Sequence, residues 1–215
     1  FYGMVGILYN KNKVDGKITR MKDLFDEKYA REVCMLYSMR DTIGMTLKML
    51  GYSMNDTDPA HINEAKDLLI KQKPNVLAYG TDELVPKVTD GTAAMAMVYS
   101  GDGVVAASED PDNVEFVIPE DGTNIAMDSM VILKTSKNKE AAEKFINFML
   151  DADNAAQNAE TTGYSTPNKA AWELLDDETK NDERRYPSDA MIAKSEEFTS
   201  DNSFYVDAWD EILAQ

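Results

Sequence analysis

The hydrophobic positions between residues 93 and 133 fall into three short runs, which read AAMAMVYSGDG, VEFVIPEDG and NIAMDSMVIL. Each run is bounded by glycine, proline, aspartate or asparagine, the residues that favour turns. Short apolar runs separated by such residues are typical of buried strands. The pattern therefore predicts three core strands in this part of the chain.

The rest of the first two thirds alternates between strand-like and helix-like patterns. Strands are expected over 1–9, 32–37 and 75–79, and helices over 19–30, 40–50, 59–73 and 82–90. After residue 138 the apolar spacing is helical, with helices expected over 138–149, 153–160, 166–175, 188–198 and 205–213. Alternating strands and helices predict an α/β domain with a mainly parallel or mixed sheet flanked by helices.

Two helix ends carry clear local signals. Asp58 followed by Pro59 matches an N-cap with proline at the first helical position. Gly51 follows the helix expected over 40–50, at a position where a positive φ costs glycine little. These signals predict one helix end at residue 50 and one helix start at residue 59.

Two acidic residues accompany the apolar runs. Asp102 follows Tyr99 by three positions, and Asp128 lies just before the run 130–133. A carboxylate that is buried alone is costly, so it needs hydrogen-bond donors, a cation or water. We interpret the missing partner as a cationic ligand, with a turn or cap role for Asp128 and a core role for Tyr99 as the alternatives.

Charge and cysteine content narrow the function further. The chain has 39 acids against 22 bases and a net charge of −17, which argues against nucleic-acid binding because phosphate contacts need a basic surface. Such a charge attracts small cations and equally serves solubility. The single Cys34 lies in an apolar run and is expected to be a buried small hydrophobe.

The residue types needed for several enzyme classes are missing. The only histidine, His61, falls in the first turn of a capped helix, where we expect it to face solvent instead of serving a triad. No nucleophile elbow, phosphate loop or dinucleotide fingerprint occurs, and the cysteine and histidine counts exclude a zinc site made of those residues. We expect no metal and no cofactor. A pair of carboxylates acting on a glycoside is the enzymatic alternative.

A diamine or polyamine would use the groups that are present. Each ammonium end needs a carboxylate, at roughly 1.5–3 kcal/mol for each charge-assisted hydrogen bond, and the methylene stem needs apolar or aromatic walls. An aromatic face adds about 0.5–2 kcal/mol by cation–π attraction. Tyr99, Asp102 and Asp128 provide both kinds of group at neighbouring strand ends.

Several segments, spread in order across nearly the whole chain, resemble one family. They read SMRD from residue 38, LGYS from 50, TDP from 57, KPNV from 73, MDS from 127, KNKE from 137, FINF from 145 and TGYSTPN from 162. The family is that of the spermidine/putrescine-binding proteins of polyamine ABC importers.

The resemblance implies a type II periplasmic-binding-protein fold, in which two α/β lobes close on the ligand. Residues 1–131 and 183–215 would form the second lobe, and residues 132–182 would cross back to the first. The chain would then begin partway through a larger protein and lack most of the first lobe, about a hundred residues by ordinary domain size. Apolar surface left uncovered on 132–182 would favour self-association or covering by a neighbouring chain.

The resemblance also implies ligand contacts. In this sequence Asp128 stands where the family has its pocket acid, and Tyr99 stands where the family has its pocket aromatic residue. Asp41, which follows Arg40, stands where the family has an acid directly after an arginine. Further contacts are expected at Asp102, as in putrescine-type members, at Ser38, where the family commonly has an acid, and at Tyr164 and Thr199. Ala126 stands where the family usually has an aromatic residue, which removes one face for the ligand stem.

The function implied by the resemblance is that of a receptor without chemistry. Ligand binding would favour a closed form that docks on a membrane permease served by an ATPase. The protein would act at the extracellular face of the cytoplasmic membrane or in the periplasm, tethered or fused upstream of residue 1. The alternatives are a receptor of the same fold for an amino acid or a metal complex, and a hydrolase that uses Asp102 and Asp128.

Overall fold

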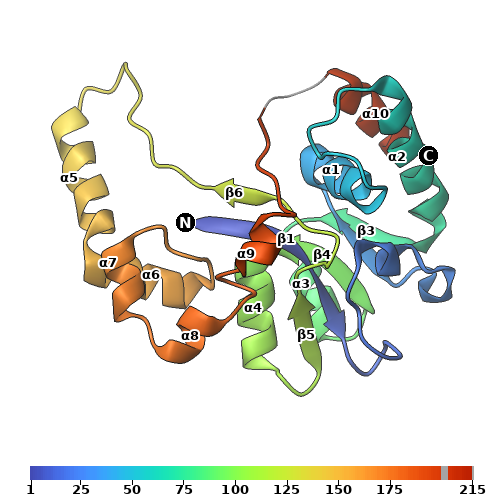
Figure 1. The fold of residues 1–215 in the computed structure, drawn as a ribbon, viewed down its shortest axis with the longest axis horizontal. Helices are drawn as coiled ribbons and strands as arrows, with labels where there is room; N and C mark the ends of the chain where they lie inside the picture. Colours follow the sequence, from blue (N-terminus) through green and yellow to red (C-terminus); the bar gives the residue numbers. More distant parts are fainter. Residues whose placement is uncertain (200–202, 215) are drawn as a thin grey trace.

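A six-stranded mixed sheet forms the centre of the computed structural model, which describes residues 1–199 and 203–214 (Figure 1). The strands are β1 (Tyr2–Asn10), β2 (Val33–Leu36), β3 (Val76–Gly80), β4 (Met95–Tyr99), β5 (Val114–Val117) and β6 (Ile125–Met127). Their order is β3-β2-β4-β1-β5, and β6 pairs with the beginning of β1. The α/β class with a mixed sheet is therefore confirmed.

Strand β1 connects most of the sheet. It pairs antiparallel with β4 on one side and β5 on the other, with Ile7 opposite both Met97 and Val117. Its first residues pair with β6, where Gly3 lies opposite Ala126. The parallel pairs are β2 with β3 and β2 with β4. Because β1 is apolar and buried from Met4 onward, it anchors the main hydrophobic core.

Two groups of helices pack on this sheet. One group contains α1 (Met39–Met49), α2 (Pro59–Gln72) and α10 (Ser203–Ala214), which contact one another, and the other contains α3 (Leu84–Thr89) and α4 (Ser100–Glu109). The predicted ends are confirmed, since the Asp58 side chain caps α2 and Gly51 follows α1 with a φ of +89°. Trp209 of α10 is buried against Tyr37 and Tyr79, with ring centroids 5.8 and 5.9 Å away.

The prediction of a single amphipathic helix over 19–30 is wrong. Two short 3₁₀ helices, η1 (Met21–Phe25) and η2 (Glu27–Tyr29), take its place. Asp26 separates them because its backbone is extended and its side chain accepts a hydrogen bond from the Lys28 N–H, which starts a new helix. A third 3₁₀ helix, η3 (Lys73–Asn75), follows α2 at the proline that was expected to end it.

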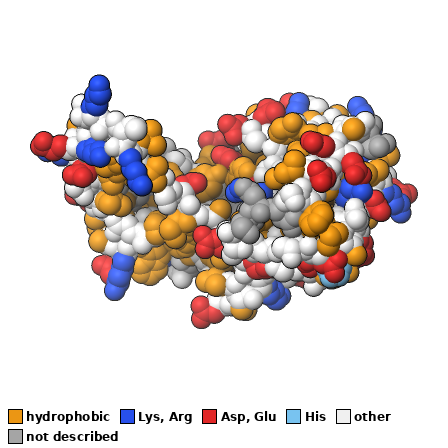
Figure 2. Space-filling model, turned by 90° about the horizontal axis from the view of Figure 1, so that it is seen from above, with side chains coloured by type: hydrophobic (Ala, Val, Ile, Leu, Met, Phe, Trp, Pro, Cys, Tyr) orange, Lys and Arg blue, Asp and Glu red, His pale blue; other side chains and the backbone are white. Residues whose placement is uncertain are grey.

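Helices α5 (Lys139–Leu150), α6 (Ala152–Thr162), α7 (Lys169–Leu174) and α8 (Asp177–Asn181) lie apart from the sheet, to the left in Figure 1. They have their own small apolar cluster, formed by Ala155, Ala156, Ala171 and Leu175. Trp172 of α7 packs edge-on against Tyr186 at 6.4 Å. Apolar side chains also face solvent here, and Figure 2 shows them over the left part of the molecule; they include Phe145, Phe148, Leu150 and Leu174.

The third predicted core strand is largely wrong. Only Ile125–Met127 forms a strand, and three of the four apolar residues in the run 130–133 are exposed, with Val131 at 77% and Leu133 at 69%. The chain leaves the sheet after β6, so the run 130–133 has no sheet neighbour to bury it. No helix among the described residues is both long and apolar enough to cross a membrane.

Three helix predictions in the last third need correction. Helix α7 begins after Asn168, whose side chain accepts hydrogen bonds from the Ala170 and Ala171 N–H groups, and so later than 166. Helix α8 was not predicted. Helix α9 (Asp189–Ile192) is short, because the chain leaves it and Ser195 and Glu196 lie beside Thr123 and Asn124.

Candidate ligand-binding site

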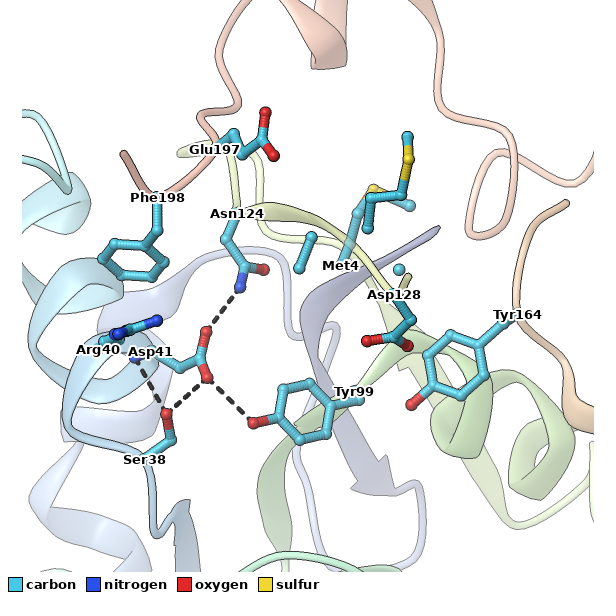
Figure 3. A pocket seen from close by; sticks show the side chains of 13 residues that line it. Met4, Ser38, Arg40, Asp41, Tyr99, Asn124, Asp128, Tyr164, Glu197 and Phe198 are labelled. Carbon is cyan, nitrogen blue, oxygen red and sulfur yellow. Dashed lines mark hydrogen bonds between the residues drawn. The ribbon is translucent and has the colours of Figure 1, made fainter. Parts of the chain in front are cut away.

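An open cavity of about 590 Å³ lies where α1 begins, β4 ends and β6 ends (Figure 3). Segments that are distant in the sequence meet there. The residues that line it are Gly3, Met4, Ser38, Arg40, Asp41, Tyr99, Asn124, Ala126, Met127, Asp128, Tyr164, Glu197 and Phe198. This set includes five of the seven expected contacts, namely Ser38, Asp41, Tyr99, Asp128 and Tyr164.

Asp41 is the most enclosed acid of this cavity, with only 7% of the residue exposed. Its carboxylate accepts hydrogen bonds from three neutral donors: the Ser38 hydroxyl at 2.7 Å, the Tyr99 hydroxyl at 3.0 Å and the Asn124 amide at 2.6 Å. Burial raises the pKa of Asp41, and the hydrogen bonds from Ser38 and Tyr99 and the charge of Arg40 oppose that rise. These three hydrogen bonds come from neutral groups, so they orient the carboxylate without neutralising it.

Ser38 holds Asp41 in place. It is the N-cap of α1, and its hydroxyl oxygen accepts a hydrogen bond from the Asp41 N–H while the hydroxyl donates to the Asp41 carboxylate. This reciprocal pair resembles a capping box and fixes the first turn of the helix. The Ser38 hydroxyl proton therefore points at Asp41, and the residue acts on a ligand mainly through that acid.

Asn124 is a lining residue that the sequence did not indicate as functional. It is buried, and its side-chain oxygen accepts a 2.9 Å hydrogen bond from the Val5 N–H of β1. Its amide group is thereby turned toward Asp41, so Asn124 joins the central strand to the first turn of α1. The only sequence signal was its position in the turn before β6.

Asp128 follows β6, and its backbone N–H donates to the Phe1 carbonyl at 3.0 Å. The residue is exposed to the cavity and stands beside two tyrosines. Burial raises the pKa of Tyr99 and of Tyr164, and the Asp128 charge adds a smaller rise to each. The two rings are therefore protonated walls beside a carboxylate, as an ammonium site requires.

Tyr164 owes its position to two glycines. A Cβ atom built on Gly3 would lie 2.7 Å from the tyrosine ring, and one built on Gly101 would overlap it. The ring thus fits between the backbone of β1 and the first turn of α4. Phe1 stacks against it with ring centroids 6.0 Å apart.

Asp102 lies in a second cavity, of about 560 Å³, which shares Asp128 and Tyr164 with the first. The Tyr164 hydroxyl donates to the Asp102 carboxylate at 3.4 Å. Burial raises the pKa of Asp102, and the nearby Asp82 charge adds to the rise. The structure therefore brings Asp102 next to the main cavity, within hydrogen-bond distance of the Tyr164 hydroxyl.

Thr199 is not brought to the cavity. Its backbone N–H and its hydroxyl both donate to the Asn55 side chain, at 3.0 and 3.3 Å, which turns the residue away. Its neighbours Glu197 and Phe198 line the cavity instead, and the sequence did not single them out. The contact expected from Thr199 has a physical obstacle, because Asn55 already occupies its polar atoms.

Two further groups bear on the chemistry. His61 is only partly exposed, since it stacks on Tyr52 at 3.8 Å and its Nδ1 contacts Asp56 at 2.8 Å, so the expectation of a solvent-facing ring holds only in part. Cys34 is buried, as expected. The described residues contain no group of three or more histidine, cysteine, aspartate or glutamate side chains that could hold a metal ion.

Residues 2–187 match the family model described as bacterial extracellular solute-binding protein. The chain belongs to this family. The solute-binding chain is 39% identical to the spermidine/putrescine-binding periplasmic protein of Salmonella typhimurium, over 91% of this chain and 56% of that protein. It is 37% identical to the protein of the same name from Escherichia coli, over 99% of this chain and 62% of that protein.

Solved structures give the same relationship for the solute-binding chain. The spermidine/putrescine ABC transporter substrate-binding protein PotD from Streptococcus pneumoniae is 35% identical, with a TM-score of 0.86 over 100% of this chain and 66% of that chain. A putative spermidine/putrescine ABC transporter protein from Listeria monocytogenes is 40% identical, with a TM-score of 0.89 and the same coverage. The chain thus spans between about half and two thirds of the length of these relatives.

Proposed function

We propose that this chain carries the ligand-recognition surface of an extracellular receptor for polyamines such as putrescine and spermidine. The observation that carries the proposal is the buried carboxylate of Asp41, held by three neutral donors in a cavity that also contains Asp128. The names of the relatives, which are spermidine/putrescine-binding proteins, support the same ligand class.

In the proposed complex, one ammonium group lies between Asp41 and Tyr99, and another lies at Asp128. Each charge-assisted hydrogen bond would contribute roughly 1.5–3 kcal/mol. The methylene stem would pack on Tyr164 and Phe198, and Asp102 would attract the cationic ligand through its negative charge in the second cavity. Ala126 leaves one wall without a ring, so we expect weaker stem packing than an aromatic residue would give.

The transport role follows from the same proposal. The receptor would deliver its ligand to a membrane permease served by an ATPase, outside the cytoplasmic membrane or in the periplasm, and would be tethered or fused upstream of residue 1. Helices α5–α8 would belong to the other lobe, as part of a crossing segment over 132–182, which their separate apolar cluster supports. Their exposed apolar side chains would lie against the rest of that lobe or, in this chain alone, against a second copy.

A second candidate solute is an amino acid with well-separated ends. Arg40 lines the same cavity as Asp41 and Asp128, and a guanidinium is a suitable partner for a carboxylate. Hydrolysis by Asp102 and Asp128 is the enzymatic alternative, but the family consists of solute-binding proteins, which supports a receptor that performs no reaction.

Calorimetric titration of the chain with putrescine, spermidine and γ-aminobutyrate tests the proposal. We expect binding of the two polyamines, and we expect Asp41→Asn and Asp128→Asn each to weaken it by about tenfold or more, as the loss of one charge-assisted bond implies. Glu143→Gln, an exposed acid on α5, is the control and should bind normally. Binding of the amino acid alone would favour the second candidate, and loss of turnover of a glycoside in Asp128→Asn would favour the enzyme.

A further inference from the structure

The segment 195–199 passes the cavity with its backbone fixed on both sides. The Glu196 N–H donates to the Thr123 carbonyl at 3.0 Å, and the Ile125 N–H donates to the Glu196 carbonyl at 2.8 Å. One residue further, the Asn55 side chain donates to the Glu197 carbonyl at 2.9 Å. The direction in which each side chain of this segment leaves the backbone is therefore determined.

Glu196 serves as the anchor of the segment. Its carboxylate forms a 2.8 Å ion pair with Lys48 of α1 and accepts hydrogen bonds from the Ser53 hydroxyl and, at 3.3 Å, from the Met54 N–H. Hydrogen bonding to Lys48 and Ser53 lowers the pKa of Glu196 against the opposing effect of burial, so the acid is ionised and already neutralised within the protein. Glu196 is therefore not available to pair with a cationic ligand.

Glu197 projects differently. Successive side chains of an extended segment alternate in direction, so the fixed orientation of Glu196 toward α1 directs Glu197 away from that helix, and Glu197 is among the residues that line the cavity. Its carboxylate is exposed and lines the cavity with Asp41 and Asp128, each from a different part of the fold (Figure 3). Within residues 1–199 and 203–214, no cation forms an ion pair with Glu197.

We infer that Glu197 binds the additional ammonium group of a triamine and so favours spermidine-like over putrescine-like solutes. This inference rests on the proposed function. A diamine has two ammonium groups, which the Asp41 and Asp128 carboxylates neutralise, whereas a triamine brings a third charge that needs its own partner. Arg40 offsets part of the negative charge of the cavity, and Asp102 in the adjoining cavity adds to it.

Glu197→Gln tests this inference in the 215-residue chain. The substitution keeps the size of the side chain and leaves the Glu196 anchor intact, so we expect unchanged thermal unfolding. By calorimetry the dissociation constant for spermidine should rise about fivefold, the upper range for a solvent-exposed charge pair, and that for putrescine by less than about twofold. Glu143→Gln, which removes an exposed carboxylate that lines neither of the two cavities, should change neither constant.

The outcomes separate the inference from the proposed function. If Glu197→Gln weakens the two polyamines equally, or changes neither, the inference is overturned while the proposed function stands. If the unsubstituted chain binds no polyamine at all, the proposed function fails and the inference fails with it. A selective loss for spermidine, partly restored in Glu197→Asp, supports the assignment of the third ammonium to this carboxylate.

Discussion

The hydroxyl of Tyr99 donates a 3.0 Å hydrogen bond to Oδ2 of Asp41, 58 positions away in the sequence. This bond joins the end of β4 to the first turn of α1, and it places an aromatic face beside a buried negative charge. The proposed ammonium site depends on this pairing. Neither residue would be correctly placed by its own strand or helix alone.

Removing that hydroxyl is the first prediction. Tyr99→Phe should reduce polyamine affinity by about tenfold, because in the proposed complex the hydroxyl oxygen accepts a hydrogen bond from the ammonium group, and a hydrogen bond to a charged group contributes roughly 1.5–3 kcal/mol. The ring itself remains in this variant. The measurement is calorimetric titration at constant pH. Tyr52→Phe is the matched control, since it also removes a tyrosine hydroxyl bonded to a carboxylate, that of Glu64, but outside the cavity. Equal affinities of Tyr99→Phe and the unsubstituted chain would contradict the prediction.

The second prediction concerns the close fit of Tyr164 against Gly101. Alanine normally stabilises a helix relative to glycine by about 0.5–1 kcal/mol, yet Gly101→Ala should lower the free energy of unfolding by about 1–3 kcal/mol, because its methyl group overlaps the tyrosine ring. Chemical denaturation measures this change. In a Tyr164→Ala background the same substitution should be neutral or stabilising, and an undiminished penalty there would show that the ring is not its cause.

The third prediction concerns the anchor of the segment 195–199. Glu196→Gln leaves Lys48, whose side chain is only 7% exposed, without its carboxylate, so the free energy of unfolding should fall by about 1–3 kcal/mol. Glu140→Gln breaks the exposed Lys144 pair on α5 and should cost less than about 0.5 kcal/mol. The double variant Lys48→Met/Glu196→Gln should lose less free energy of unfolding than the sum of the losses in the two single variants. If the two losses simply add, Lys48 and Glu196 do not form a direct ion pair.

The fourth prediction is a pH dependence of stability that involves His61. Its hydrogen bond with Asp56 raises the pKa of His61 above 6.5, and the same contact helps to lower the pKa of Asp56. For a histidine whose folded pKa is raised, the stabilisation is complete below pH 6.5 and is lost as the pH rises through the folded value.

Unfolding by urea at several pH values between 5.5 and 8.5 measures the effect. The unsubstituted chain should lose more stability over this range than His61→Asn, and Asp56→Asn should behave like His61→Asn because it removes the partner. The His61 ring is accessible to solvent, so the difference should be small. If His61→Asn loses more stability than the unsubstituted chain between pH 5.5 and 8.5, the predicted direction of the pH dependence is wrong.

Local patterns in the sequence predicted most of the sheet and several helix ends. Hydrophobic alternation and turn residues predicted five of the strands to within two residues at most ends. Asp58-Pro59 marked the start of one helix, because the aspartate caps it and proline fits its first turn, and Gly51 marked the end of another, because glycine adopts a positive φ easily. The pattern failed at Met130–Leu133. Apolar character normally indicates burial, but Met130, Val131 and Leu133 are exposed because the chain has left the sheet there.

The candidate site was predictable only as far as single residues reveal chemistry. Asp128 and Asp102 were noticeable as acids near apolar sequence, and the family resemblance added Asp41, Ser38 and Tyr164. Asn124 and Glu197 were missed because their placement depends on tertiary contacts, one with the Val5 backbone and the other with the anchor formed by Glu196. Thr199 was expected in the cavity, but its orientation depends on a distant side chain, Asn55.

The positions of the two tryptophans give this chain a native optical assay. Trp209 is enclosed by aromatic rings in the main core, whereas Trp172 is partly exposed among the helices apart from the sheet. A Trp172→Phe variant would emit only from the core, and a Trp209→Phe variant only from the outlying helices. Recording the fluorescence of both variants during denaturation would therefore reveal whether the main core and the helices apart from the sheet unfold together or one after the other.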